Sequence, residues 1–328
     1  MRNFGYQKAG DMDTALAVLA ERPGARPLAG GAELVNLLKA RIEAPDLLLD
    51  INALDLDEIR SGSTGLRIGA LARMADVAGD PAVALGYPVI AQALEASASP
   101  QVRNAGTVAG NLMQRTRCPY FRAETELPCN KRRPGSGCAA AAGDDRASAI
   151  FGWSEHCRAV HPSDLAVALS ALDSRIHVRS LRGERTIDIG DFYRLPAEQA
   201  APDTDLSDDE LITCIDVPAS PAAATSRYLK VRERSSYEFA LVSAAVAIAA
   251  QDGLIRTARI ALGGVAPRPW RLRAAEQALV GTPLSAAAVR AAIEPSFADA
   301  RPSHGNGFKI ELAKRAAVRA VLLAGGGA

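Results

Sequence analysis

Residues 28–34 read Leu-Ala-Gly-Gly-Ala-Glu-Leu, a short stretch that joins a predicted strand to a predicted helix. Its two consecutive glycines, Gly30 and Gly31, let the backbone approach a ligand closely and leave amide N–H groups unblocked. The amino terminus of the following helix adds a partial positive charge, so the loop suits an anion such as a pyrophosphate. Taken alone, the same pair of glycines is also compatible with a tight turn that binds nothing.

A second glycine segment, residues 106–111, reads Gly-Thr-Val-Ala-Gly-Asn. Thr107 and Asn111 offer side-chain hydrogen bonds, and the two glycines permit close approach of a ligand. A turn or β-bulge without a ligand is the alternative. Neither segment matches the Gly-x-Gly-x-x-Gly fingerprint or the phosphate-binding P-loop pattern, so a Rossmann site and a nucleotide hydrolase are both disfavoured.

The hydrophobic pattern around the first loop predicts a small α/β unit. A helix begins at Asp11–Asp13 and ends at Pro23-Gly24, and residues 26–28 form a strand that runs into the loop. A second helix starts at Glu33, and residues 47–51 (Leu-Leu-Leu-Asp-Ile) are interpreted as a buried strand.

Beyond residue 52 the pattern predicts a mixture of strands and helices, with one long segment that has no periodicity. Residues 100–111 are interpreted as a turn-rich strand segment. Residues 115–153 are interpreted as a functional loop, because structureless stretches of this length are uncommon in compact domains. The expected strands are residues 66–70, 175–178, 185–189, 211–217, 226–232, 240–250 and 255–263, and the expected helices are residues 74–77, 88–98, 164–172, 269–280, 285–292 and 309–323.

The composition excludes several classes of function. The chain has 328 residues, of which 48% are hydrophobic, so it has enough apolar material for a buried core and for two or three domains. Its formal net charge of +1 and its aromatic content of 5% argue against nucleic acids and anionic membranes as partners. The longest apolar run, residues 239–250, is too short to span a bilayer, and the first ten residues carry no secretory signal pattern.

Four of the five cysteines lie within residues 118–157, with the spacing C-x10-C-x8-C-x18-C. This spacing fits neither a zinc finger or ribbon nor the cysteine run of bacterial ferredoxins. Basic residues crowd the segment, and their positive charge offsets the negative charge of a thiolate-ligated cluster. Four thiolates on one loop suit a [4Fe–4S] cluster or a structural zinc ion. The fifth, Cys214, is interpreted as a small buried hydrophobe in a strand, and His156 and His161 as structural residues that are also conceivable ligands.

Together these segments resemble one family over nearly the whole chain, the FAD-binding medium subunit of the xanthine dehydrogenase, carbon monoxide dehydrogenase and aldehyde oxidoreductase group. The likeness is carried by residues 29–34 (Ala-Gly-Gly-Ala-Glu-Leu), 68–70 (Ile-Gly-Ala), 103–111 (Arg-Asn-Ala-Gly-Thr-Val-Ala-Gly-Asn) and 162–165 (Pro-Ser-Asp-Leu). Family members often differ at Ala32 and Glu33 and have a glycine at Ala109. The cysteine loop looks closest to the bacterial aldehyde oxidoreductase branch, whose flavin subunit holds an extra [4Fe–4S] cluster.

The resemblance implies an α+β fold of the vanillyl-alcohol-oxidase-like (PCMH-type) class, with a two-lobed FAD-binding module and a C-terminal three-stranded sheet with helices. The expected domains are residues 1–52 for an N-terminal α/β lobe, residues 53–222 for a larger lobe with the cysteine-rich loop 115–157, and residues 223–328 for a C-terminal αβ domain. FAD would lie between the first two lobes.

The resemblance also implies roles for individual residues. The two glycine loops would bind the FAD pyrophosphate, Asp164 would contact the adenosine side, and Lys230 and Tyr237 would lie near the flavin ring. No catalytic acid or base that acts on a substrate is expected in this chain. The expected FAD-binding residues are Leu28, Ala29, Gly30, Gly31, Ala32, Glu33, Leu34, Gly106, Thr107, Ala109, Gly110, Asn111, Arg117, Ser163, Asp164, Lys230 and Tyr237, and the expected cluster ligands are Cys118, Cys129, Cys138 and Cys157.

By this resemblance the chain is the electron-transfer subunit of a heterotrimeric molybdenum hydroxylase, most similar to an aldehyde oxidoreductase. A large subunit with a molybdenum cofactor would hydroxylate the substrate, a [2Fe–2S] small subunit would take the electrons, and FAD would pass them to a terminal acceptor. The complex would lie in the cytoplasm, or in the periplasm by co-export with a signal-bearing partner. The alternatives are a zinc-stabilised assembly subunit, a stand-alone FAD oxidase, and the flavin subunit of a xanthine dehydrogenase or aromatic acyl-CoA reductase.

Overall fold

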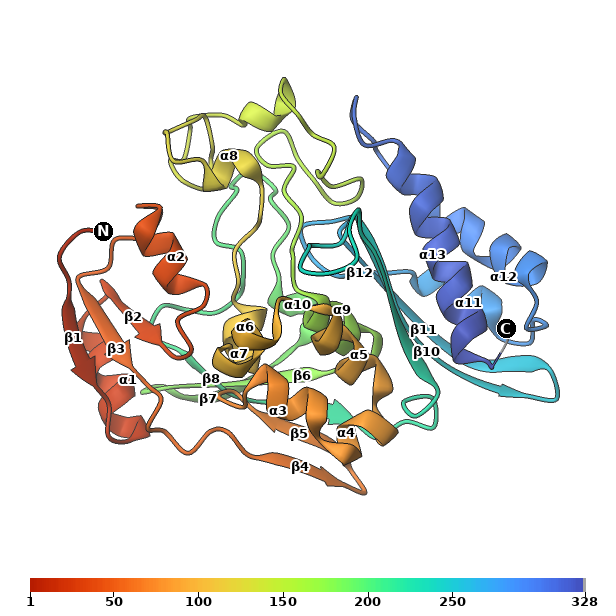
Figure 1. Ribbon diagram of the computed structural model, residues 1–328, viewed down its shortest axis with the longest axis horizontal. Coiled ribbons are helices and arrows are strands. Elements are labelled where there is room, and N and C mark those ends of the chain that lie inside the picture. Colours follow the sequence, from red (N-terminus) through yellow and green to blue (C-terminus); the bar gives the residue numbers. More distant parts are fainter. Residues whose placement is uncertain (327–328) are drawn as a thin grey trace.

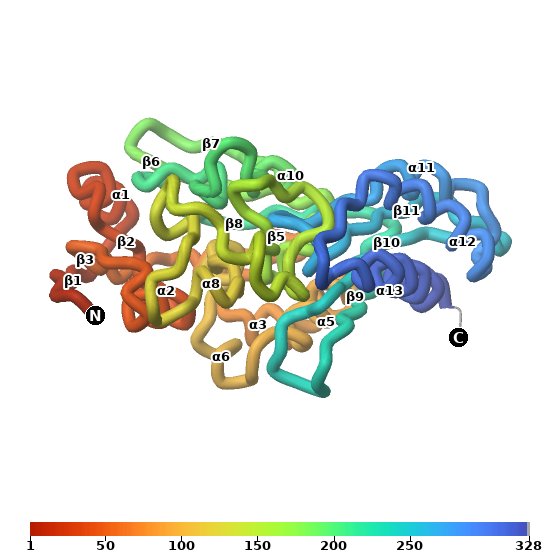
Figure 2. Tube along the Cα trace, turned by 90° about the horizontal axis from the view of Figure 1, so that it is seen from above, coloured from red at the N-terminus to blue at the C-terminus, as the bar shows by residue number. Residues whose placement is uncertain are grey.

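Three β-sheets, each with its own helices, follow one another along the chain in the computed structural model, which describes residues 1–326 (Figure 1). The N-terminal, central and C-terminal parts lie side by side along the long axis of the molecule in both views (Figures 1 and 2). No helix within residues 1–326 is long and apolar enough to cross a membrane. The architecture is α+β, as predicted from the sequence.

The N-terminal lobe contains a parallel three-stranded sheet in the order β1-β3-β2. Its strands are β1 (Gly5–Lys8), β2 (Ala25–Leu28) and β3 (Leu47–Asp50), and its helices are α1 (Met12–Glu21) and α2 (Leu34–Lys39). Helix α1 begins where predicted, because the Asp11 carboxylate accepts a 2.7 Å hydrogen bond from the amide of Thr14. The first glycine loop joins the carboxyl end of β2 to α2, which confirms the predicted strand–loop–helix order.

The central lobe is built on an antiparallel five-stranded sheet in the order β4-β5-β8-β6-β7. One face packs on helices, and alternate residues such as Ile176 and Ile215 are fully buried in that interface. The short elements β4, α4 and α10 were not predicted. The strands are β4 (Ile59–Gly62), β5 (Gly65–Gly69), β6 (Arg175–Ser180), β7 (Gly183–Asp188) and β8 (Leu211–Pro218), and the helices include α3 (Met74–Gly79), α4 (Pro81–Gly86), α5 (Pro88–Ala96), α9 (Asp164–Ala171) and α10 (Ile189–Phe192).

The interpretation of residues 100–111 as a strand segment is wrong. The chain forms two short helices here, α6 (Pro100–Ala105) and α7 (Val108–Leu112). Ser99 and Thr107 act as N-caps, since each hydroxyl accepts a hydrogen bond from an amide in the first turn of its helix. The glycines and polar residues that favoured a turn therefore mark a helix boundary, and the second glycine segment begins a helix as the first one does.

The C-terminal part contains four strands rather than the predicted three. Strands β9 (Ser226–Val231), β10 (Val242–Gln251) and β11 (Leu254–Gly263) occupy the predicted segments, and β12 (Trp270–Arg271) adds a short pairing to β11. The helices α11 (Arg273–Leu279), α12 (Ala286–Ile293) and α13 (Phe308–Ala324) cover one face of this sheet (Figure 1). The predicted helix over residues 269–280 is shorter because its first residues form β12.

The cysteine-rich loop stands at one edge of the molecule, next to the N-terminal lobe (Figure 1). It contains only the short helix α8 (Pro119–Arg122) and a single 3-10 turn at Ala139–Ala141. Most of its length is irregular, as predicted. The C-terminal part of the loop is nevertheless held in place. The buried ammonium of Lys309 on α13 donates hydrogen bonds to the carbonyl oxygens of Ala147 (2.9 Å) and Ser148 (3.0 Å).

Candidate functional site

A cavity of about 800 Å³ lies between the N-terminal lobe and the central lobe, within the range of about 300–1,000 Å³ that is usual for ligand sites. All of the expected FAD-binding residues line it except Ser163. The lining members of that set are Leu28, Ala29, Gly30, Gly31, Ala32, Glu33, Leu34, Gly106, Thr107, Ala109, Gly110, Asn111, Arg117, Asp164, Lys230 and Tyr237. The fold therefore brings these residues around one space, although they come from separate stretches of chain.

The two glycine segments touch each other, and Gly30 is the point of contact. A Cβ atom on Gly30 would lie 1.9 Å from the carbonyl oxygen of Ala105 and 3.1 Å from the Cα atom of Gly106. Only glycine allows the two backbones to approach so closely. The next residue, Gly31, has a φ of +69°, in the left-handed region that favours glycine. Both glycines are thus required by the shape of the cavity wall.

Side-chain caps hold the second glycine segment in place. The Thr107 hydroxyl accepts a 3.2 Å hydrogen bond from the amide of Gly110. The Asn111 side-chain oxygen accepts a 2.6 Å bond from the hydroxyl of Ser163, which also caps α9. Ser163 therefore supports the wall from behind instead of facing the cavity. Ala109 lies inside α7 with a negative φ, so its methyl group is accommodated without backbone strain.

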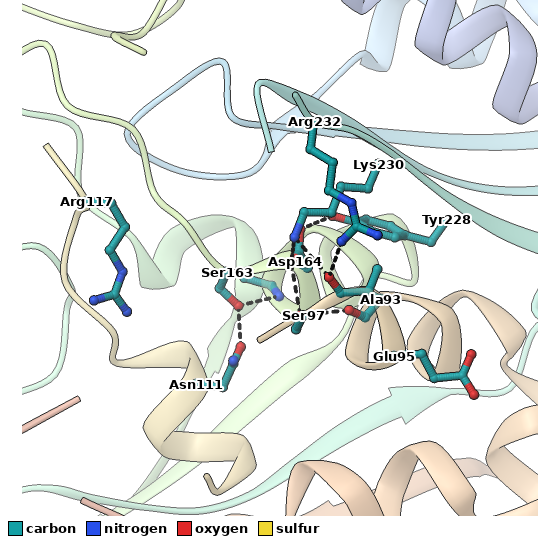
Figure 3. Close-up of polar contacts among 12 residues, drawn as sticks. Ala93, Glu95, Ser97, Asn111, Arg117, Ser163, Asp164, Tyr228, Lys230 and Arg232 are labelled. Carbon is teal, nitrogen blue, oxygen red and sulfur yellow. Dashed lines mark hydrogen bonds and ion pairs between the residues drawn. The ribbon is translucent and has the colours of Figure 1, made fainter. Parts of the chain in front are cut away.

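A buried ion pair forms another part of the wall. The Lys230 ammonium donates to the Asp164 carboxylate at 2.8 Å, and the two side chains are 4% and 6% exposed. Asp164 also accepts from the Ser97 hydroxyl at 2.9 Å and from the Tyr228 hydroxyl, and Figure 3 shows these donors converging on its carboxylate. Burial and the neighbouring carboxylate both raise the pKa of Tyr228, so its hydroxyl remains a donor.

Asp164 was expected on the adenosine side of FAD and Lys230 near the flavin ring. The two side chains pair directly and so mark a single region of the cavity. Their positions relative to the parts of FAD stay predictions. Although Lys230 lies on strand β9, its side chain is buried and not solvated.

Glu33 connects the first glycine loop to the start of the cysteine-rich loop. Its carboxylate pairs with the guanidinium groups of Arg117 (2.7 Å) and Arg122, and it accepts a 2.9 Å hydrogen bond from the backbone amide of Arg115. The Glu33 side chain is 16% exposed. Because two arginines offset its charge, this carboxylate offers little repulsion to an anion held by the adjacent loop. The unusual residue at this position is therefore compatible with a phosphate site.

Two buried nitrogen atoms in the cavity wall, Arg117 Nε and His161 Nε2, have no hydrogen-bond partner among the described residues. Buried polar atoms are normally satisfied, so both are suited to contact a ligand. Burial lowers the pKa of His161 to about 3, so its imidazole is neutral near pH 7. His161 was expected only as a structural residue or a metal ligand. The sequence signal for a place at the cavity was its position directly before the Pro162-Ser163-Asp164 motif.

The four cysteines of the loop surround one small region. Cys118 packs against the buried Cys157, and Cys129 and Cys138 face each other in an isolated antiparallel bridge. Burial raises the pKa of Cys157 to about 11 and also raises that of Cys118, and the nearby Cys138 contributes to both shifts. All four are free thiols. The structure thus gathers the predicted ligands, whereas His156 is exposed.

The spacing of the thiols distinguishes between the two candidate metals. A zinc ion about 2.3 Å from each of four sulfurs needs those sulfurs about 3.8 Å apart. Within residues 1–326, a single group of three His, Cys, Asp or Glu ligand atoms lies within 4.8 Å of one another, and it includes none of these four cysteines. The thiols are set more widely than one zinc ion requires, which favours a larger cluster in which several irons and sulfides separate the ligands.

The segment over residues 196–207 contacts both the cavity and the cysteine-rich loop. Asp203 pairs with Lys131 of the cysteine-rich loop and with Arg115 at 2.6 Å, and Arg115 also pairs with Glu43 at 2.8 Å. Asp203 lines the cavity as well. These ion pairs connect the cavity wall to the cysteine-rich loop. No sequence pattern predicted these ion pairs.

A Glu33→Gln substitution is expected to loosen the start of the cysteine-rich loop. Glutamine keeps one acceptor for the Arg115 amide but leaves Arg117 and Arg122 without their counter-charge, at a cost of about 1–3 kcal/mol. Hydrogen exchange followed by mass spectrometry is expected to show faster exchange in residues 115–122. Glu126→Gln is the matched control, because Glu126 lies on the same loop in an exposed pair with Arg133. Equal exchange in the two variants would refute this role of Glu33.

Comparisons with known proteins agree with this geometry. Residues 2–220 match the family described as FAD binding domain in molybdopterin dehydrogenase, and residues 227–324 match the CO dehydrogenase flavoprotein C-terminal domain. The chain is 45% identical to the aldehyde oxidoreductase FAD-binding subunit of Escherichia coli (strain K12), over 96% of each chain. It is 30% identical to the glyceraldehyde dehydrogenase medium chain of Sulfolobus acidocaldarius, over 86% of this chain and 83% of that one.

Solved structures of related enzymes share the fold of this chain. The carbon monoxide dehydrogenase of Hydrogenophaga pseudoflava has a chain that superposes with a TM-score of 0.76 and 26% identity, over 99% of this chain and 98% of that chain. This likeness confirms the expected flavoprotein fold, with the C-terminal sheet corrected to four strands.

Proposed function

Since the chain belongs to the FAD-binding medium subunits of the molybdopterin dehydrogenase family, we propose that it is the flavin subunit of an aldehyde oxidoreductase. The high identity to an aldehyde oxidoreductase subunit over almost the full length of both chains supports this choice within the family. A xanthine dehydrogenase subunit is a more distant match, with 24% identity.

One observation carries the proposal: the two glycine segments, about seventy residues apart in sequence, meet at Gly30 and line the same cavity. Two turns that did not shape a common site would not need to pack so closely that a Cβ atom at Gly30 cannot fit between them. We propose that the backbone of Gly30 and Gly31, together with Thr107 to Asn111, binds the diphosphate of FAD. The unsatisfied Arg117 Nε and His161 Nε2 add donors or acceptors to the same wall.

The wall residues position and shield the cofactor, and none is placed to abstract a proton from an organic substrate. The Lys230 ammonium is neutralised by Asp164 and also donates to the carbonyl oxygen of Ala96 at 3.1 Å, so it contributes a fixed dipole rather than a mobile charge. The exposed Tyr237 and Phe239 lie at the edge of the cavity, where aromatic side chains would cover the flavin ring from solvent. FAD would supply a centre that accepts two electrons and can release them singly.

We further propose that Cys118, Cys129, Cys138 and Cys157 ligate a [4Fe–4S] cluster. The thiols share one region, their spacing exceeds that of a zinc site, and the basic residues of the loop surround them. The ion pairs of Glu33 and Asp203 keep this cluster loop against the FAD cavity. Such an arrangement suits the transfer of single electrons between the two centres.

The partners proposed for this chain are a small [2Fe–2S] subunit and a large subunit with the molybdenum cofactor. Electrons from substrate hydroxylation would reach this chain through the small subunit and leave to a terminal acceptor. We propose that the complex functions in the cytoplasm, or in the periplasm after co-export with a signal-bearing partner.

The absorption spectrum of the purified protein tests these assignments. Flavin bands at about 370 and 450 nm, with a broad shoulder that dithionite bleaches, are expected. Partner chains that co-purify are expected to contain molybdenum and additional iron. A colourless chain that contains zinc would contradict the proposal and support an assembly subunit instead.

A further inference from the structure

Outside the FAD cavity, three potential metal ligands meet on the solvent-facing side of the central sheet. His177 on β6 and Cys214 on β8 are direct cross-strand partners, and Asp216 lies two residues farther along β8 on the same face. Their ligand atoms all lie within 4.8 Å of one another. The opposite face carries the buried Ile176 and Ile215, so the alternation of the strands fixes these three side chains outward.

Cys214 therefore differs from its sequence interpretation as a buried hydrophobe. It is half-buried, and the side chains of His177 and Asp216 are 30% and 33% exposed. This partial exposure lets an ion reach the group, while the strand backbone holds the ligands in place. Rigid elements such as paired strands suit metal ligands better than loops do.

Groups that would orient the ligands are already present. The Thr186 hydroxyl lies 3.2 Å from His177 Nδ1, which leaves the Nε2 atom to face Asp216 at 2.9 Å. Arg67 holds the Asp216 carboxylate with two bonds of 2.7 and 2.6 Å. Metal-bound histidines and carboxylates usually have such outer partners, which fix the ring and the carboxylate in their binding orientations.

We propose that His177 Nε2, Cys214 Sγ and Asp216 Oδ2 bind one divalent transition-metal ion of the zinc class. A nitrogen, a thiolate sulfur and a carboxylate oxygen form a mixed donor set that zinc accepts, whereas calcium and magnesium require oxygen ligands. On binding, the Cys214 thiol releases its proton to solvent, and the ion takes the place of the hydrogen bond between His177 and Asp216. Water completes the fourth position.

The alternative is a surface network in which Asp216 simply pairs with Arg67 and His177. That network accounts for two of the three side chains but gives no reason for the thiol of Cys214 beside them. Arg67 also offsets part of the negative charge that a thiolate and a carboxylate bring together. The inference is independent of the FAD and cluster assignments, because none of its residues lines the cavity or belongs to the loop 115–157.

Zinc binding to the full chain, isolated with its cofactors, tests the proposal. After equilibration with zinc chloride and dialysis, the wild type is expected to retain one more zinc ion per chain than Cys214→Ser and His177→Ala. Thr186→Val is expected to weaken zinc binding by about 10–100-fold, because it removes only the outer partner of His177. Asp188→Asn is the matched control, since Asp188 forms an exposed ion pair with Arg175 on the same sheet.

A second measurement uses only the wild type, so its result does not depend on whether the variants fold. Zinc is expected to slow alkylation of Cys214 by iodoacetamide, measured on the peptide that contains this residue, and to leave iron content unchanged. Equal zinc content in the wild type and both ligand variants, or alkylation of Cys214 that zinc does not slow, would overturn the proposal.

Discussion

Gly30→Ala is expected to remove FAD from the protein while the chain remains folded. The added Cβ atom would lie 1.9 Å from the carbonyl oxygen of Ala105, so the first glycine loop must move away from the second. Even a displacement that costs about 1.4 kcal/mol lowers affinity about tenfold, and this clash involves backbone that cannot rotate away. Flavin content per chain and the dissociation constant for added FAD measure the loss, and far-ultraviolet circular dichroism checks the fold.

Gly79→Ala is the matched control for this substitution. Gly79 is the last residue of α3, the helix whose first residue, Met74, lines the cavity. A methyl group added to Gly79 would meet no atom within 4 Å, and the residue does not have a positive φ. This variant is expected to keep its FAD. Normal flavin content in Gly30→Ala would show that the contact between the two glycine segments does not shape the FAD site.

Cys129→Ser is expected to lose most of its iron and its broad visible absorbance, with FAD largely retained. Removal of one of four thiolates leaves a cluster with an incomplete ligand set, and a serine hydroxyl is a poor substitute for a soft thiolate. Cys129 lies opposite Cys138 in the loop, outside the residues that line the cavity. Iron and flavin analyses of the same sample therefore separate the two centres.

The fifth cysteine supplies the control. Cys214→Ser removes a thiol on the central sheet, away from the cysteine-rich loop, and is expected to keep a full complement of iron. Unchanged iron in Cys129→Ser would exclude this residue as a ligand. Iron loss in Cys214→Ser as well would indicate that thiol substitution acts through general instability.

Individual helices and strands were predictable because they depend on interactions between residues that are close in sequence. The helix that starts after Asp11 has an N-cap and an apolar face, and the strands over residues 242–263 are rich in apolar residues on both sides of a tight turn. Residues 100–111 were misread because Asn, Thr and Gly favour both turns and helix starts, and only the packed structure decides between them.

The candidate site was predictable only as a set of residues. Motif resemblance selected the residues of both glycine segments, but not the contact between Gly30 and Ala105 or the pairing of Asp164 with Lys230. Those depend on how distant segments pack. The neighbourhood of His177 and Cys214 likewise depends on the register between β6 and β8, which no local pattern specifies.

The three-way contact of Glu33 has a consequence for how the subunit matures. A single carboxylate restrains both the segment next to the proposed FAD diphosphate and the segment next to Cys118, the first of the proposed cluster ligands. If ordering one segment favours the other, thermodynamic reciprocity requires that cluster insertion raise flavin affinity by the same factor as flavin raises retention of the cluster. Iron starvation of the producing cells would then yield a subunit that keeps most of its FAD but binds it more weakly than the subunit that holds its cluster.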